Sequence, residues 1–175
     1  MSPLKKLKNE TYALFRRDTH PELPIDPDVV EPGVYKWPVH FTPTFLLVVF
    51  IGGFLGAMAR YWVAEQLPTS TNSFPAATLV VNLLGAFLLG LLLEGLARLG
   101  KDIGVRRIVR LTMGTGFMGA FTTYSTLAVE ADLLLRHGAA MTAWVYVAVS
   151  VVGGLALSAA GIQIATVHHK RRTAR

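Results

Sequence analysis

The sequence predicts an all-α membrane protein with four transmembrane helices, the third of them broken. Of its 175 residues, 52% are hydrophobic and only 16% are charged, a balance typical of a small polytopic membrane protein. No alternation of apolar and polar residues indicates transmembrane strands. A spanning helix needs roughly 20 mostly apolar residues, and four segments provide them: Phe45–Glu65, Ala76–Leu96, Ile108–Leu135 and Ala143–Ala165.

Three regions of the chain differ in composition. Residues 1–43 form a polar, proline-rich N-terminal tail without a sustained apolar period, which predicts disorder. The tail lacks the basic start and apolar core of a secretory signal, so we expect no cleavage. Residues 44–166 form the predicted four-helix transmembrane domain, and residues 167–175 form a basic C-terminal tail.

The residue types in the chain exclude or disfavour several functions. There is no cysteine, which excludes disulfides and thiolate metal sites. The five histidines lie in tails or loops, without ligand spacing to a carboxylate. No nucleophile is paired with a base and there is no nucleotide-binding loop, so we expect no enzymatic activity. The net charge of +6 is better explained by a cytoplasmic membrane face than by a nucleic-acid partner.

The first apolar segment carries two glycines and one arginine that need an explanation. Gly52 and Gly56 form a small-xxx-small pair, which predicts close helix packing. Arg60 lies within the helix, near its far end. Two interpretations of Arg60 stay open: its side chain reaches the interface, or its charge draws anions into a vestibule.

The second and fourth segments each place polar side chains one helical turn apart. Thr78 and Asn82 share one face in the second, and Tyr146 and Ser150 share one face in the fourth. An amide at the bilayer centre must find hydrogen-bond partners. Asn82 therefore either joins two helices or donates its NH₂ group to a passing anion.

The third segment contains the most polar stretch of the membrane domain, GTGFMGAFTTYSTL, residues 114–127. The third segment as a whole has 28 residues, whereas roughly 20 are enough to span a bilayer. Its glycines and hydroxyl residues weaken a continuous helix. We expect two half-helices joined by an unwound turn near Gly119–Thr123. Carbonyl groups freed in such a turn can hold a cation; the alternative is a kink without a ligand.

Three motifs carry a resemblance to a known family. GGFLGAMARY, ATLVVN and GFMGAFTTYSTL, in this order, resemble the patterns G-G-x-x-G-A-x-x-R-Y, G-T-L-x-V-N-x-x-G and G-x-x-G-x-x-T-T-F-S-T-F of the Fluc (CrcB) fluoride channels. The resemblance covers about residues 47–165. It implies a passive, fluoride-selective channel in the cell membrane that lowers cytoplasmic fluoride.

The resemblance also implies an assembly and a metal ion. Members of this family form antiparallel dimers with two narrow pores at the subunit interface. A structural Na⁺ lies at the dimer centre, held by backbone carbonyls that correspond to Gly119 and Thr122 here. Fluoride and membrane lipid are the other expected partners.

The same resemblance implies an anion pathway. Asn82 would point into the pore, and the lining aromatic positions of the family fall at Tyr124 and Leu127. Neutral donors suit fluoride because they replace its hydration shell, and an aromatic ring edge can face an anion directly. The predicted pathway comprises Arg60, Thr78, Asn82, Tyr124, Ser125, Thr126, Leu127, Glu130, Tyr146 and Ser150, with Thr78, Glu130, Tyr146 and Ser150 forming a polar track.

Three positions depart from the family pattern, and two other functions compete. Tyr124 and Leu127 replace the paired phenylalanines of the family, and Ala77 replaces the glycine before Thr78. The loss at Leu127 favours a non-conducting partner subunit of a heterodimeric channel. A small proton-coupled multidrug exporter needs a carboxylate near the middle of its first helix, whereas Glu65 lies at the end of that helix here.

The distribution of basic residues predicts one orientation in the membrane. The 96–110 loop and the C-terminal tail carry nine Lys or Arg residues, and the opposite side carries only Arg136. This bias predicts cytoplasmic termini. A fixed orientation disfavours an antiparallel homodimer, so the bias predicts a heterodimer with an oppositely oriented paralogue. A homodimer is the alternative.

Overall fold

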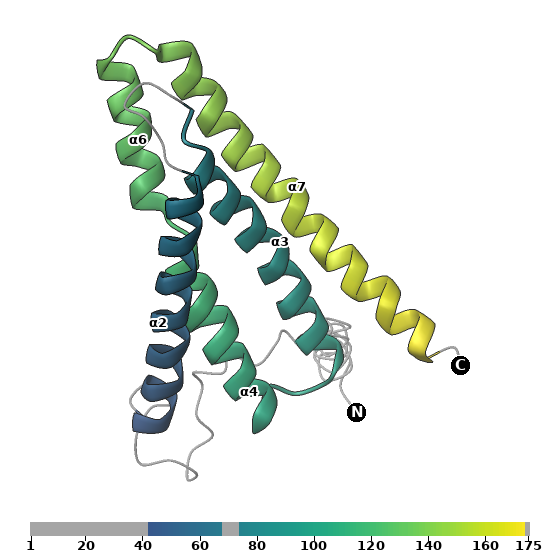
Figure 1. Cartoon of the computed structure of the whole chain (residues 1–175). Coiled ribbons are helices and arrows are strands. Elements are labelled where there is room, and N and C mark those ends of the chain that lie inside the picture. Colours follow the sequence, from purple (N-terminus) through teal and green to yellow (C-terminus); the bar gives the residue numbers. More distant parts are fainter. Residues whose placement is uncertain (1–41, 68–73, 174–175) are drawn as a thin grey trace, which may run out of the picture. The chain divides into compact units, whose positions relative to one another are not determined.

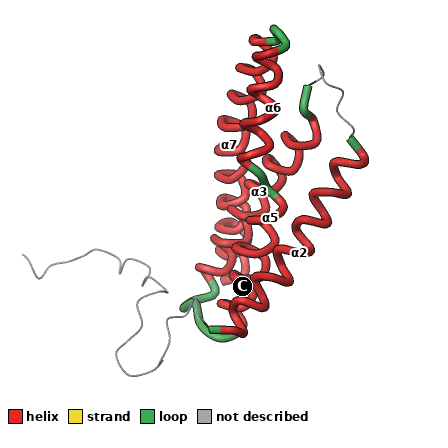
Figure 2. Tube along the Cα trace, turned by 90° about the vertical axis from the view of Figure 1, so that its left-hand side faces the viewer, coloured by secondary structure: helices red, strands yellow, loops and turns green. Residues whose placement is uncertain are grey.

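The structure is a computed structural model that describes residues 42–67 and 74–173. All of them belong to one compact unit, His40–Arg175. Regular structure in the described ranges is entirely helical, without a strand, which confirms the all-α prediction (Figure 2). The predicted tail of residues 1–43 lies outside the described residues, except for its last two positions.

Three long apolar helices cross the unit. They are α2 (Pro43–Gln66), α3 (Ala76–Arg98) and α7 (Ala140–Thr173), and each is long and apolar enough to span a membrane. At 1.5 Å per residue, α2 and α3 are each about 35 Å long and α7 about 51 Å, against a hydrocarbon core of about 30 Å. These helices confirm the first, second and fourth predicted spans.

The region of the third predicted span, 108–135, is not one continuous α-helix. It consists of α4 (Val105–Val109), the wider π-helical turns of η2 (Arg110–Met118), the short α5 (Gly119–Phe121) and α6 (Tyr124–Arg136). Between α5 and α6, Thr122 and Thr123 have extended backbone. The sequence predicted unwinding from Gly119 onward, but Gly119–Phe121 are helical and only the two threonines are extended.

Glycines allow α2 and η2 to pack with their backbones in contact. A Cβ atom on Gly52 would collide with the Thr112 carbonyl, and one on Gly56 would collide with the Phe117 carbonyl. From the other side, a Cβ atom on Gly116 would lie 2.6 Å from the Val49 carbonyl oxygen. The predicted packing role of the small-xxx-small pair is therefore confirmed.

The α3 and α7 helices lie side by side along most of α3 (Figure 1). Glycine again permits the contact, because a Cβ atom on Gly90 would meet the Ser158 carbonyl and one on Gly161 would meet the Phe87 carbonyl. The α6 helix packs on the first turns of α7 after a tight turn at Gly138, whose φ is +78°. Two glycine-lined pairs of helices thus build the unit.

The elements run up and down, so the ends of the unit differ in chemistry (Figure 1). The start of α2, the end of α3, α4 and the end of α7 lie at one end, which carries most of the described basic side chains. The other end carries Arg136 and exposed aromatic side chains, among them Trp62 and Trp144. Aromatic side chains of this kind are enriched at membrane interfaces.

Candidate functional site

The extended pair between α5 and α6 is held by the amide of Asn82 on α3. Asn82 Nδ2 donates to the Thr123 carbonyl oxygen at 2.9 Å, and the Thr123 N–H donates to Asn82 Oδ1 at 2.8 Å. The amide thus satisfies both backbone groups of one residue, as a neighbouring strand would. Backbone groups without partners are costly in the membrane interior, so this pairing stabilises the break.

The α3 helix reaches the break because Gly85 has no side chain. A Cβ atom at Gly85 would collide with Thr122 Cγ2, and Gly85 is buried. The Thr122 hydroxyl in turn donates to the Met118 carbonyl at 2.9 Å. The extended threonines therefore lie directly against α3, one turn from Asn82.

The Thr123 side chain begins the second half-helix. Its Oγ1 accepts from the Thr126 N–H at 3.1 Å, as an N-cap does, and it lies 3.0 Å from Thr126 Oγ1 and 3.2 Å from Ser125 Oγ. An N-cap satisfies one of the free N–H groups in the first turn of a helix. Part of the hydroxyl cluster in the sequence therefore has a structural role, because it caps the start of α6.

The two carbonyl groups predicted to hold a cation have lost their helical donors. In a continuous α-helix, the Thr123 N–H would bond to the Gly119 carbonyl and the Thr126 N–H to the Thr122 carbonyl. These N–H groups donate instead to Asn82 Oδ1 and Thr123 Oγ1. Gly119 also borders open space, since a Cβ atom there would meet nothing within 4 Å. Backbone carbonyl groups that a helix break releases can coordinate a cation.

A second polar cluster joins α3, α6 and α7 through Glu130. Thr78 Oγ1 donates to Glu130 Oε1 at 2.9 Å, and the Tyr146 hydroxyl donates to Glu130 Oε2 at 2.7 Å. Tyr146 is completely buried, and its ring meets Phe74 edge to face at 5.6 Å between centroids. Three of the four predicted track residues are thus in direct contact.

Ser150, the fourth predicted track residue, lies one helical turn from Tyr146 on the same face of α7. It is only 8% exposed, and its hydroxyl has no hydrogen-bond partner among the described residues. An unpaired buried hydroxyl is uncommon and calls for an explanation such as a water or an ion. The track therefore ends in a polar group with unused bonding capacity.

Tyr124 and Leu127 lie in different environments. Tyr124 begins α6 and is 83% exposed, and Ser125 and Thr126 beside it are exposed as well. Leu127 is 9% exposed and packs in a cluster with Leu134 and Tyr146. The side chain at position 127 is therefore part of the interior of the protomer, beside the track tyrosine.

Arg60 stands apart from both clusters. It is half-buried on α2, six residues before the end of that helix, and it makes no ion pair or hydrogen bond with the described residues. This position near the end of α2 fits both interpretations of Arg60, a side chain that reaches the interface and a charge that draws anions into a vestibule.

Thr123 is the site residue that sequence reasoning missed. The sequence marks it only as one hydroxyl residue in a cluster. Its backbone N–H and carbonyl both form hydrogen bonds with Asn82, and its side chain caps α6. A threonine at the start of a helix is a signal for an N-cap. The pairing with Asn82 has no such local signal.

Comparison with known proteins identifies the family. Residues 47–162 match the family described as "CrcB-like protein, Camphor Resistance (CrcB)". The chain belongs to the CrcB family. The matched range includes both polar clusters and the Asn82–Thr123 pairing.

Curated CrcB relatives are similar over most of their length. The chain is 44% identical to "Fluoride-specific ion channel FluC 1" of Cutibacterium acnes over 116 residues, which are 66% of this chain and 81% of that protein. It is 42% identical to "Fluoride-specific ion channel FluC 2" of Leifsonia xyli over 137 residues, 78% and 94% of the two chains. Identity to "Fluoride-specific ion channel FluC" of Chlorobaculum tepidum is 46% over 120 residues, 69% and 93%.

Proposed function

We infer that this protein is a fluoride-selective ion channel that lowers cytoplasmic fluoride by passive export through the membrane. The observation that carries the inference is family membership, with identities of 42–46% to relatives named as fluoride-specific channels. The geometry supports it, since neutral donors gather around an extended break within apolar helices. A channel is not an enzyme, and the residues named here take no part in bond making or breaking.

The proposed role of Asn82 is double. One amide hydrogen bonds to the Thr123 carbonyl, and the second hydrogen is left to donate to an anion. The first turn of α6 adds free N–H groups and the positive end of the helix dipole beside the same break. Fluoride passing here exchanges water for neutral donors, which lower its free energy without trapping it as a fixed charge would.

We further propose that α4, η2, α5 and α6 together form the third of four membrane spans, broken at Thr122–Thr123. Extended backbone at membrane depth is tolerated where protein or a water-filled cavity surrounds it. Here α3 covers one side of the break through Gly85 and Asn82. The exposed side, with Gly119 and Tyr124, is the side that we assign to a partner subunit in an antiparallel dimer.

The carbonyl groups of Gly119 and Thr122 would hold a structural Na⁺ at the centre of that dimer. Their lost helical donors and the open space at Gly119 support the assignment. A two-fold axis would bring two carbonyls from each subunit to one point. The ion would supply a fixed positive charge near the anion pathway, while the residues of the chain provide the donors.

We propose that the end with α4 and the last turns of α7 faces the cytoplasm, because the basic side chains gather there. The dimer is then either a homodimer or a heterodimer with an oppositely oriented paralogue. A non-conducting partner subunit is the second candidate, because Leu127 lacks the aromatic ring of the family. A proton-coupled exporter is disfavoured, because the only carboxylate on α2 is Glu65, at the end of the helix.

Reconstituted liposomes test the proposed function. Vesicles loaded with fluoride and carrying the full-length protein should release it when an ionophore provides a counter-current. Vesicles loaded with chloride should retain their contents. Release of both anions at equal rates would overturn selectivity, and release of neither would favour the partner-subunit alternative.

A further inference from the structure

The end of α3 is surrounded by basic side chains that the fluoride pathway does not use. This basic end comprises Arg98, Lys101, Arg106, Arg107, Arg110, Lys170 and Arg171. They come from the end of α3, the connection to α4, the first turns after it, and the end of α7. Both views place the last turns of α7 and that connection at the same end of the unit (Figures 1 and 2).

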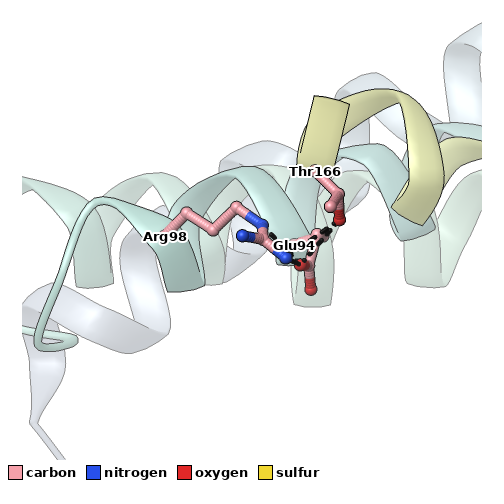
Figure 3. A network of polar contacts seen from close by, with 3 residues as sticks. All are labelled: Glu94, Arg98 and Thr166. Atoms are coloured by element: carbon pink, nitrogen blue, oxygen red, sulfur yellow. Dashed lines mark hydrogen bonds and ion pairs between the residues drawn. The ribbon is translucent and has the colours of Figure 1, made fainter. Parts of the chain in front are cut away.

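A polar clamp fixes how α7 meets the end of α3. Arg98 Nε donates to Glu94 Oε1 at 2.6 Å, and its terminal nitrogen donates to Thr166 Oγ1 at 2.9 Å. The Thr166 hydroxyl donates back to Glu94 Oε1 at 3.1 Å, so the three residues close a ring (Figure 3). The clamp therefore turns the Thr166 face of α7 toward α3.

The orientation of α7 also determines where Lys170 lies. It lies four residues after Thr166, on the same face and one turn further along α7. Because α3 ends at Arg98 while α7 stays helical through Thr173, the exposed Lys170 lies beyond the end of α3. The clamp thus places Lys170 on the face of α7 that turns toward α3, beyond the last turn of α3.

The connection after α3 is itself ordered by arginines. Arg106 donates to the Leu99 carbonyl and so caps the C-terminus of α3. Arg107 Nε donates to the Asp102 carbonyl at 3.0 Å, and Arg110 Nε donates to Asp102 Oδ2 at 2.9 Å. These contacts hold the path of the connection between α3 and α4.

Charge at the basic end is not balanced within the described residues. Arg98 pairs with Glu94, and Arg107 and Arg110 share Asp102. No described carboxylate lies within 4.0 Å of the nitrogens of Lys101, Arg106, Lys170 or Arg171. At least these four cations are left for an anionic partner.

We propose that the basic end binds the phosphate groups of anionic phospholipids in the adjoining leaflet. The cations lie where the apolar stretches of α3 and α7 end, which is the depth of lipid headgroups. Basic sites at the ends of transmembrane helices bind such headgroups. Arginine and lysine are the usual phosphate-binding side chains.

Thermal unfolding of the full-length protein in detergent tests this proposal. Added phosphatidylglycerol should raise the unfolding temperature by several degrees, whereas phosphatidylcholine and inorganic phosphate at equal concentration should not. The combined variant Lys101→Gln, Lys170→Gln, Arg171→Gln should lose this shift. The charge-preserving variant Lys101→Arg, Lys170→Arg, Arg171→Lys and the opposite-end variant Arg136→Gln should keep it.

Three results would overturn the proposal. Equal shifts with phosphatidylcholine would show a general lipid effect, and an undiminished shift in the Gln variant would place the effect elsewhere. Equal shifts with inorganic phosphate would reassign the site to the free ion. If the Gln variant does not fold, native mass spectrometry of the wild-type protein decides, because a bound phosphatidylglycerol must resist competition by phosphatidylcholine.

Discussion

Asn82 and Thr123 are joined by two hydrogen bonds, one in each direction, across the point where α3 passes the break between α5 and α6. One side-chain amide thus replaces the helical partners that the Thr123 backbone has lost. The second amide hydrogen of Asn82 has no hydrogen-bond partner among the described residues. Support of the break therefore depends on the same residue to which we assign donation to an anion.

Replacing Asn82 with Leu should abolish fluoride flux and lower stability. Leu suits lipid, but it leaves the N–H and carbonyl of Thr123 without partners, at about 1–3 kcal/mol for each group. Fluoride efflux from liposomes and thermal unfolding measure the two effects. Leu84→Val, on the exposed side of α3, is the control and should change neither. Unchanged flux in Asn82→Leu would show that the amide only packs.

Thr123→Val should weaken the start of α6, whereas Thr123→Ser should not. Valine has nearly the same shape as threonine but lacks the Oγ1 atom that accepts from the Thr126 N–H. Loss of an N-cap costs about 1 kcal/mol, and thermal unfolding measures it. Equal unfolding temperatures for the two variants would contradict the capping role.

Substitutions at Tyr124 and Leu127 should have different effects: one should change fluoride flux and the other should change stability. Tyr124→Leu should reduce flux at an unchanged unfolding temperature, because the ring is 83% exposed. Leu127→Ala should lower stability by about 2–5 kcal/mol, as buried leucines do, since Leu127 packs against Tyr146 and Leu134. Opposite results would mean that position 127, and not 124, lines the anion pathway.

Gly56→Ala should destabilise the protein, and Gly95→Ala should not. A Cβ atom at position 56 collides with the Phe117 carbonyl, whereas one at position 95 meets nothing within 4 Å. Overpacking of this kind costs about 1–3 kcal/mol, while alanine at an open helical position gains up to about 1 kcal/mol. Unfolding in denaturant compares the two, and equal effects would remove the proposed contact between α2 and η2.

The sequence predicted three of the helices, α2, α3 and α7, from the length of their apolar segments. The spacing of Thr78 and Asn82 also placed these two residues on one face of α3. The extent of the unwound turn was predicted less well, because the presence of glycines weakens a helix without determining the residue at which it ends. Phe121 stays helical, and the stop comes where Asn82 binds the backbone.

Contacts between distant segments could not be predicted in the same way. Thr123 pairs with a residue 41 positions away, and this pairing depends on the close approach allowed by Gly85. Tyr124 and Leu127 belong to one motif, yet only Leu127 is buried, because α7 covers that side of α6. Such differences arise from packing between helices and leave no periodic trace in the sequence.

Single-cysteine labelling tests the proposed orientation. The chain has no cysteine, so Ala174→Cys gives one reactive thiol in the C-terminal tail. An impermeant maleimide should label it only after the cells are opened. Substantial labelling in intact cells would mean two orientations, which favours a homodimer over the paired-paralogue alternative.

The reversal potential in a planar bilayer tests selective, passive fluoride conduction most directly. With a tenfold fluoride gradient and equal chloride on both sides, the current should reverse at the fluoride equilibrium potential, about 59 mV for a monovalent ion. A proton gradient should not move that value. Reversal near zero, a shift with the proton gradient, or no current through the reconstituted protein would contradict the account.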